Sequence, residues 1–271
     1  MELTLTAVAP LFAAAALLLA TAAHAADEIV PELATQTEVD LIIELGLGGR
    51  IQPEYEGSDG YEVAAFPIIG LGYLNIPGLF AIGSTDPQVG GLSFGPSFNY
   101  VSNREFGSDS ELAGLNEVDG TFEAGLRASF EWTNAQIWGE ARYAFGGVDG
   151  FVAEFGVDAV ARPTELLELK LGPFATLASA DYMRGYFGVT DQESANTGFR
   201  VSSYTPDGGF KSVGLRAVAK YEFKPTWYLN ADASYSKLVG DAGDSPIVLA
   251  GDDDQFTFGL GLSKKFTLNL F

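Results

Sequence analysis

Apolar and polar side chains alternate with a period of two along much of this 271-residue chain, and this pattern limits the fold more than any other feature. Successive side chains of a β-strand point to opposite faces, so each alternating segment predicts a strand with one apolar and one polar face. In residues 121–132 the apolar face consists of Phe122, Ala124, Leu126, Ala128, Phe130 and Trp132. Similar segments occur at 39–52, 135–146, 151–162, 166–178, 211–223, 227–236 and 254–268. The sequence therefore predicts an all-β protein.

Composition agrees with many strands and excludes several functions. The chain has 33 glycines, 13% aromatic residues and only 19% charged residues, as expected for strands separated by turns. Its net charge of −21 would repel phosphates, and no basic stripe offsets that charge, so we predict no nucleic-acid binding. The chain contains no cysteine, which excludes disulfides and cysteine-based zinc or redox sites.

The N-terminal segment is typical of an export signal. An almost wholly apolar run precedes Ala23-His24-Ala25, a small-x-small motif of the kind that signal peptidase cleaves. We predict a signal peptide at residues 1–25 and a mature chain of residues 26–271 that forms a single barrel domain. Glu2 is the only charge before the run and the first Lys or Arg is Arg50, which departs from the usual basic start and points to a misplaced start codon. A membrane-spanning helix is the alternative, since about 20 apolar residues can cross a bilayer.

Cleavage of this segment would remove most catalytic chemistry. His24 is the only histidine, so the mature chain would hold neither His nor Cys. It would then lack the commonest general base, the commonest metal ligand and the thiolate nucleophile, and a serine nucleophile would ordinarily need a histidine. We therefore predict a protein that is not an enzyme and has no cofactor.

Alternation alone does not separate a soluble β-sandwich from a membrane barrel, but two further features favour the barrel. The segments run for about 12 to 15 residues, enough to cross a bilayer at a tilt, whereas strands of globular proteins average about 5 to 6. Aromatic residues gather near the segment ends, as in the girdles of outer-membrane barrels: Trp132, Tyr143, Phe145, Tyr221, Phe223, Trp227 and Phe256.

The polar faces carry charges of both signs, which could pair across a lumen. The candidate lumen-facing charges are Glu123, Arg127, Glu131, Arg216, Lys220 and Glu222. The alternative is that these side chains face solvent on a soluble protein, but an exported chain with apolar outer faces favours the lumen.

The connections alternate in length, as expected for periplasmic turns and extracellular loops. Short ones are predicted near 75–78, 133–134, 162–164 and 224–225, and long ones at 103–118, 179–208 and 239–253. Residues 79–102 must then supply an odd number of strands, although 24 residues are many for one strand and few for three. The prediction is an antiparallel transmembrane β-barrel of 10 to 12 strands, with twelve favoured.

Several loop motifs resemble those of the MltA-interacting protein (MipA)/OmpV family of outer-membrane proteins. They begin with Tyr55-Glu56-Gly57-Ser58-Asp59 followed by Pro67, and with Arg104 followed by Leu112-Ala113-Gly114-Leu115. Tyr182-Met183-Arg184-Gly185-Tyr186-Phe187-Gly188-Val189-Thr190 with Gln192 resembles the family's Y-M-x-x-Y-F-G-V-T segment. Residues 208–213 and 238–248 resemble G-G-[LF]-K-x-V and L-x-G-D-A-x-x-S-P-I-V. The motifs occur in order across nearly the whole mature chain.

The resemblance implies a protein of the outer membrane of a Gram-negative bacterium, in contact with its lipid and lipopolysaccharide. It further implies a scaffold that binds periplasmic murein hydrolase and synthase. The alternative is a small pore for polar solutes, tied to stress or osmolarity, because the inner faces are charged.

Two loop regions are candidate sites. Residues 179–208 are too aromatic for a freely solvated loop, and we predict that they plug or cover the barrel mouth through Tyr182, Met183, Tyr186, Phe187 and Gly188. An equal alternative is that they pack only to hold neighbouring loops.

The acidic residues Asp241, Asp244, Asp252, Asp253 and Asp254 lack the spacing of a calcium loop, and we read them, like Asp109, Glu111, Glu117 and Asp119, as solvated charges that bind divalent cations loosely. Gly46-Leu47-Gly48-Gly49 lies within a strand and is read as strand glycine near bulky neighbours rather than as a nucleotide-binding loop.

Overall fold

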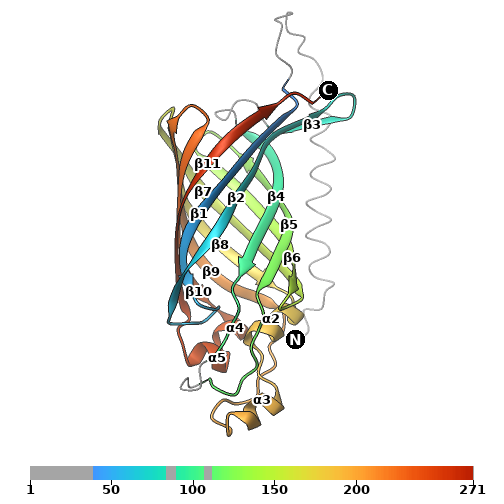
Figure 1. The fold of residues 1–271 in the computed structure, drawn as a ribbon, viewed down its shortest axis with the longest axis vertical. Helices are drawn as coiled ribbons and strands as arrows, with labels where there is room; N and C mark the ends of the chain where they lie inside the picture. Colours follow the sequence, from blue (N-terminus) through green and yellow to red (C-terminus); the bar gives the residue numbers. More distant parts are fainter. Residues whose placement is uncertain (1–38, 84–89, 107–111, 271) are drawn as a thin grey trace, which may run out of the picture. The chain divides into compact units, whose positions relative to one another are not determined.

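A computed structural model describes residues 39–83, 90–106 and 112–270. The predicted signal peptide and its cleavage site lie outside these residues. The described chain is an antiparallel sheet curled into a nearly closed barrel, with four short helices at one end (Figure 1). Among the described residues no helix is long and apolar enough to span a membrane.

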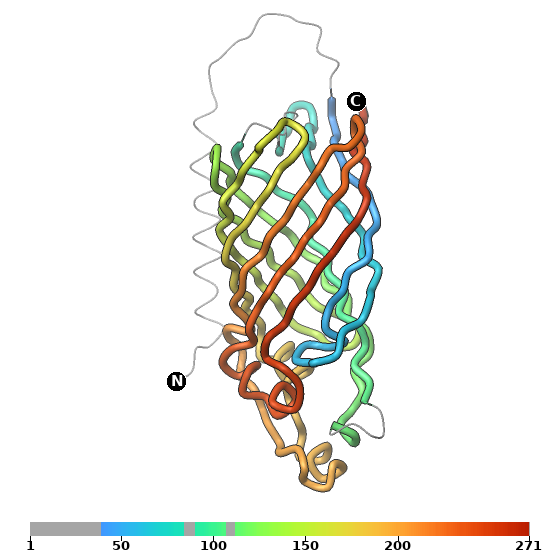
Figure 2. The backbone as a smooth tube through the Cα atoms, turned by 90° about the vertical axis from the view of Figure 1, so that its left-hand side faces the viewer, coloured from blue at the N-terminus to red at the C-terminus, as the bar shows by residue number. Residues whose placement is uncertain are grey.

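The strands follow one another around the barrel as an up-and-down meander. They are β1 (Leu41–Pro53), β2 (Tyr61–Ile76), β3 (Phe80–Gly83), β4 (Gly91–Val101), β5 (Thr121–Glu131), β6 (Ala135–Gly146), β7 (Gly150–Thr164), β8 (Leu167–Ala178), β9 (Gly209–Lys224), β10 (Trp227–Leu238) and β11 (Asp254–Leu268). The sheet order is β3-β2-β1-β11-β10-β9-β8-β7-β6-β5-β4, so β1 pairs with β11 as well as with β2. Figure 2 shows the strong tilt of these strands about the barrel axis.

The described residues form eleven strands, which lies within the predicted range of ten to twelve and one below the favoured number. The described part of residues 79–102 contributes two strands, β3 and β4, instead of the predicted odd number, and residues 84–89 between them lie outside the described residues. The other predicted strands are confirmed to within a few residues at each end.

The two ends of the barrel differ as predicted. Short turns at 77–79, 132–134, 165–166 and 225–226 lie at the end where β1 begins and β11 ends (Figure 1). The third turn lies after, not at, residues 162–164, because β7 continues to Thr164 through a shift in its register with β8. At the other end the connections at 54–60, 102–120, 179–208 and 239–253 are long, but the turn at 147–149 between β6 and β7 is short and departs from the predicted alternation. Since outer-membrane barrels have short periplasmic turns and long extracellular loops, we call these the periplasmic and extracellular ends.

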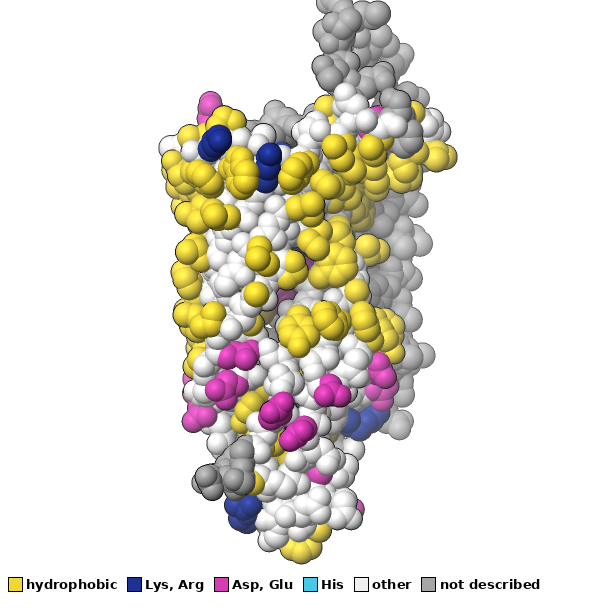
Figure 3. Space-filling model, viewed as in Figure 1, with side chains coloured by type: hydrophobic (Ala, Val, Ile, Leu, Met, Phe, Trp, Pro, Cys, Tyr) yellow, Lys and Arg dark blue, Asp and Glu magenta, His cyan; other side chains and the backbone are white. Residues whose placement is uncertain are grey.

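Burial is inverted relative to a soluble protein, which decides between sandwich and membrane barrel. On β5, Leu126 is 72% exposed on the outside, whereas Glu123 is 2% exposed on the inside. The outward side chains form a broad hydrophobic belt, below which acidic side chains gather at the extracellular end (Figure 3). The predicted girdle residues all lie exposed on this outer surface, and pairs such as Tyr143 and Phe151 pack ring against ring at 4.9 Å. A belt of this kind is stable only against lipid.

Candidate functional site

The extracellular mouth of the barrel is covered by a helical cap. Helix α2 (Ala180–Phe187) lies across it together with α4 (Gly240–Gly243) and α5 (Pro246–Leu249), as Figures 1 and 2 show. The buried side chains of α2 recur at helical spacing, so one face of this helix points into the barrel. They are Tyr182, Met183, Tyr186 and Phe187, each at most 1% exposed.

Small residues let α2 approach the barrel wall closely. A Cβ at Gly185 would lie 2.5 Å from Val148 Cγ1, and a Cβ at Gly150 would lie 2.8 Å from the backbone nitrogen of Tyr182. The side chains of α2 pack there with strand and turn residues and with residues of α4 and α5: Ala144, Val148, Val152, Ala178, Leu238, Ala242 and Val248. The predicted plug motif therefore forms the core of the cap, while Gly188 ends α2.

The other loop motifs converge on the same cap. The Ser245 hydroxyl donates to the Phe187 carbonyl at 2.7 Å, and the Arg104 guanidinium donates to the Tyr186 carbonyl. Gly57, with φ +95°, packs so tightly on α5 that a Cβ there would lie 2.6 Å from Val248 Cγ2. Lys211 pairs with Glu56 below the ring of Tyr182. Motifs that are far apart in the sequence therefore pack together in the cap.

A second cluster continues the cap outward. Leu112 and Leu115 pack with Val189, Val201 and Ile247, next to helix α3 (Asp191–Asn196). Thr190 and Glu193 form a capping box, which satisfies the free N–H groups of the first turn. Burial alone would raise the pKa of Glu193, but hydrogen bonds from the Thr190 hydroxyl and from the N–H groups of Thr190 and Asn116 outweigh it and hold this pKa below its ordinary value.

Polar contacts run without interruption from the cap into the lumen. The Tyr182 hydroxyl donates to Glu123 Oε1 at 3.0 Å, and the other oxygen of Glu123 accepts from Arg142 Nε at 2.8 Å. Arg142 also pairs with Glu140, which accepts from Arg127 NH1 at 3.1 Å. Burial, with the nearby carboxylates of Glu56 and Glu123, raises the pKa of Tyr182, so its phenol remains a donor.

At mid-barrel a tryptophan fills the lumen between two guanidinium groups. Trp138 is 2% exposed, and its ring lies 4.2 Å from Arg127 Cζ and 4.0 Å from Arg216 Cζ, distances typical of cation–π stacking. Arg216 is held on its other side by Asp158, at 3.5 Å, and by Glu154, at 3.9 Å. Sequence analysis missed Trp138, although its place between Gln136 and Glu140 on the polar face of β6 could have revealed it.

Three inward aromatic rings of this barrel lie opposite glycines of a neighbouring strand. Trp138 is paired with Gly156, Phe66 with Gly48 and Phe174 with Gly214. A Cβ at Gly48 would lie 2.6 Å from the Phe66 ring, so only glycine leaves room for it. This explains Gly48 within the run 46–49, which was predicted to be strand glycine near bulky neighbours.

The stack separates two cavities whose lining residues do not overlap. The extracellular one, of about 210 Å³, lies under the cap among Arg50, Glu123, Arg142, Glu154 and Lys211. The periplasmic one, of about 600 Å³, reaches the turn residues Glu165 and Leu166.

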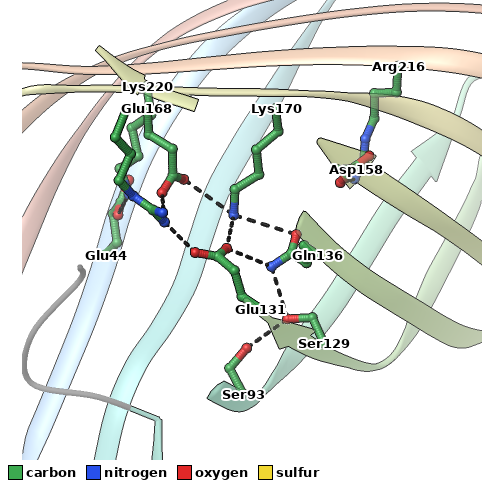
Figure 4. A network of polar contacts seen from close by, with 11 residues as sticks. Glu44, Ser93, Ser129, Glu131, Gln136, Asp158, Glu168, Lys170, Arg216 and Lys220 are labelled. Atoms are coloured by element: carbon green, nitrogen blue, oxygen red, sulfur yellow. Dashed lines mark hydrogen bonds and ion pairs between the residues drawn. The ribbon is translucent and has the colours of Figure 1, made fainter. Parts of the chain in front are cut away.

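The periplasmic cavity holds a network of charges (Figure 4). Glu131 accepts from Lys170 Nζ at 2.8 Å and from Gln136 Nε2 at 3.2 Å, and it also pairs with Arg162. Glu168 pairs with the same two cations, and Ser129 links Gln136 to Ser93. Lys220 of β9 pairs with Glu44 of β1, three strands away in the sheet.

The structure places the six predicted lumen-facing charges on the inner surface but in separate groups. Glu123 belongs to the cap network, Arg127 and Arg216 to the stack, and Glu131, Lys220 and Glu222 to the periplasmic cavity. The network also includes Arg142, Glu140 and Lys170, whose roles depend on neighbours from other strands.

The predicted acidic loop does not form one site. Carboxylate oxygens of Asp252, Asp253 and Asp254 lie within 4.8 Å of one another, but the latter two pair with Lys237 at 2.7 and 3.3 Å. Asp241 instead accepts from the backbone N–H of Asp207. Asp109 and Glu111 of the second acidic group lie outside the described residues.

Comparison with known proteins agrees with this geometry. The family model described as "MltA-interacting protein MipA" matches residues 45–266, most of the chain and all of its loop motifs. The chain belongs to the MipA family. A relative from Escherichia coli (strain K12), named "Putative outer membrane protein YiaT", is 28% identical over 180 residues, which cover 65% of this chain and 66% of that protein, just under two thirds of its length.

Solved outer-membrane barrels resemble the fold at low sequence identity. An outer membrane channel from Pseudomonas putida F1 is 11% identical, with a TM-score of 0.42, and covers 88% of this chain and 100% of its own. The translocator domain of the autotransporter NalP from Neisseria meningitidis is 11% identical, with a TM-score of 0.39, and covers 96% and 97%. The MipA-family chain is an outer-membrane β-barrel, as the sequence predicted.

Proposed function

We propose that this MipA-family barrel is a non-enzymatic scaffold that docks a murein hydrolase, and with it a murein synthase, at its periplasmic end. The family description names interaction with MltA. The observation that carries the proposal is the obstructed lumen: a protein whose mouth is capped and whose centre is filled by Trp138 is better suited to holding a partner than to conducting solutes. In this proposal residues 26–271 act as one domain, with 179–208 as its plug.

The absence of enzymatic activity rests on the residue inventory. His24 is the only histidine of the chain and the chain has no cysteine. The buried carboxylates that could act as acids or bases, such as Glu123, are engaged with arginine and tyrosine. A partner would therefore supply any hydrolysis.

The turn between β2 and β3 is the proposed contact. Leu79, 77% exposed, lies in this turn, and the exposed ring of Phe80 lies at the start of β3, both at the periplasmic end. Exposed apolar side chains on a periplasmic turn suit a protein partner.

Capture from detergent-solubilised envelopes tests the scaffold. The tagged barrel is expected to retain an MltA-type hydrolase, and Leu79→Lys is expected to weaken retention severalfold. Leu249→Lys is the matched control, because Leu249 is equally exposed, at 75%, but lies at the extracellular end. Recovery no better than that of an unrelated barrel would refute the proposal.

A pore for polar solutes is the second candidate, favoured by the charged periplasmic cavity of about 600 Å³. Liposome swelling separates the two functions: vesicles containing the barrel stay tight if it is a scaffold and pass small sugars if it is a pore.

At the other end, the acidic rim suits loose divalent bridges to lipopolysaccharide phosphates (Figure 3).

A further inference from the structure

The lysines of this chain fall into two groups. Four of the seven pair with a carboxylate: Lys170, Lys211, Lys220 and Lys237. The other three, Lys224, Lys264 and Lys265, form no ion pair with any carboxylate of the described residues, and all three lie at the periplasmic ends of β9 and β11. Lys265 lines the periplasmic cavity, which leaves Lys224 and Lys264 for the outer wall.

Lys224 and Lys264 flank one tryptophan on that wall. Trp227 of β10 is paired with Lys224 of β9 on one side and with Lys264 of β11 on the other. Residues directly opposite each other in an antiparallel ladder share a face, and Trp227 is a girdle residue of the outer surface. A register shift at Trp227 and Tyr228 places Lys224, rather than Phe223, opposite the indole.

Aromatic rings hold the Lys264 side chain without neutralising its charge. Its Nζ lies 5.3 Å from the centroid of the Trp227 ring and 5.2 Å from that of the Phe266 ring, distances typical of cation–π contacts. The ammonium therefore keeps its full charge and its donors for a group outside the protein.

The turn between β9 and β10 fixes this arrangement. Thr226 has a φ of +68°, which is strained for a β-branched residue and persists only where its surroundings hold it. Its N–H donates to Glu222 Oε1 at 2.7 Å, and its carbonyl accepts from the N–H of Lys265 at 2.8 Å. The backbone of all three strands is thus tied together beside Trp227.

The three side chains lie at the periplasmic edge of the hydrophobic belt. Leu229 and Leu262 follow Trp227 and Lys264 on the extracellular side, and both are exposed on the outer surface. Figure 3 shows basic side chains among hydrophobic ones at this edge, whereas acidic side chains gather at the opposite edge. A lysine at such a boundary keeps its methylene stem among apolar groups and its ammonium among lipid headgroups.

The charge of the row favours an anionic headgroup over a zwitterionic one. The strands of Lys224 and Lys264 are two spacings, about 10 Å, apart, so the two flexible side chains can reach one phosphate from either side of the indole. The ammonium of a phosphoethanolamine would meet two like charges and no free carboxylate, since Glu222 accepts from the Thr226 N–H and lines the periplasmic cavity.

We propose that Lys224, Trp227 and Lys264 bind the headgroup of an anionic phospholipid, phosphatidylglycerol, in the periplasmic leaflet. The two ammonium groups donate to the phosphate oxygens, and the indole packs against the glycerol. The acyl chains lie along the outward side chains of Leu229 and Leu262. Each lysine is expected to strengthen binding about fivefold.

Native mass spectrometry tests the proposal on barrels reconstituted in vesicles of equal parts phosphatidylglycerol and phosphatidylethanolamine and then extracted in mild detergent. The wild type is expected to retain phosphatidylglycerol at least tenfold better than phosphatidylethanolamine. Lys264→Gln should lower this retention about fivefold and Lys224→Gln/Lys264→Gln at least tenfold, whereas Lys264→Arg should preserve it. Heat-modifiable gel mobility checks that each variant is folded.

Lys237→Gln is the matched control, because it removes an exposed lysine at the extracellular end that pairs with Asp253 at 2.7 Å. It should retain phosphatidylglycerol as the wild type does. Equal retention of the two phospholipids by the wild type would overturn the proposal, as would undiminished retention by the double variant. Vesicles that also contain lipid A test the leaflet: displacement of phosphatidylglycerol by lipid A would contradict a site in the periplasmic leaflet, and continued retention supports it.

Discussion

The two halves of the lumen are built from the same alternating strands but are filled in different ways. In the extracellular half, aromatic side chains of α2 pack onto the carboxylate of Glu123, which is almost fully buried, and the cavity beneath the cap is only about 210 Å³. In the periplasmic half, a cavity of about 600 Å³ remains, and charges pair across it. Alternation therefore decides which side chains face inward, whereas the loops decide how much of the interior is filled by side chains and how much remains as a cavity.

This difference changes how much an ion pair contributes to the free energy of unfolding. Removing one partner of a buried pair leaves an uncompensated charge at a cost of about 3–5 kcal/mol, whereas exposed pairs contribute about 0–1 kcal/mol. Comparing matched substitutions in the two halves therefore tests whether the extracellular half is as dry as its packing indicates.

The largest effect is expected from Glu123→Leu, which leaves Arg142 buried and the Tyr182 hydroxyl without its acceptor. We expect a loss of about 3–5 kcal/mol in the free energy of unfolding. Glu131→Leu in the periplasmic cavity should cost about 1–2 kcal/mol, because Glu168 still pairs with both of its cations. Urea unfolding in lipid vesicles measures both. Equal losses would mean that the two halves are equally hydrated.

Trp138→Ala should connect the extracellular and periplasmic cavities of the lumen. Without the ring, nothing remains between the Arg127 and Arg216 guanidinium groups, and loss of a buried tryptophan costs about 3–5 kcal/mol at most. Single-channel recordings should show at least a severalfold rise in conductance or in brief openings over the wild type. Trp132→Ala, on the outer surface, is the control. An unchanged record would place the barrier in the cap alone.

Tyr182→Phe should loosen the cap while keeping its packing. It removes one hydrogen bond to a carboxylate, worth about 1.5–3 kcal/mol. Limited proteolysis should then cut residues 179–208 faster in the variant than in the wild type. Tyr143→Phe, on the outer surface, should leave cleavage unchanged. If both variants are cut at the wild-type rate, this hydrogen bond does not hold the cap.

The smallest effect is expected from acid at the tip of the cap. Because the folded-state pKa of Glu193 is depressed, its stabilisation is complete above the ordinary glutamate pKa and is lost as pH falls through the folded value. Hydrogen exchange of the α3 amides should speed up below about pH 4. Glu193→Gln should exchange at a rate that depends much less on pH over this range, after correction for intrinsic exchange. Identical pH profiles would exclude Glu193 as the group responsible.

Much of the fold could be predicted because alternation is a local signal. β5, β6, β9 and β11 begin and end within two residues of their predicted bounds. Residues 79–102 were predicted to supply an odd number of strands, three in the favoured barrel of twelve, but the described residues there form two, β3 and β4. The four residues of β3 carry too little alternation to be recognised. The cap residues could be predicted because aromatic side chains in a loop need burial. No sequence pattern indicated which strand residues they would pack against.

The sequence by itself determined the membrane barrel, its family and the inward side of each strand. These follow from period-two patterning, loop lengths and short motifs, each of which lies within one continuous stretch of the chain. Only the tertiary structure decided that Tyr182 meets Glu123 and that Trp138 stacks between Arg127 and Arg216. Those contacts join side chains from different strands and loops across the lumen, and barrel closure and strand register, rather than sequence spacing, bring them within range.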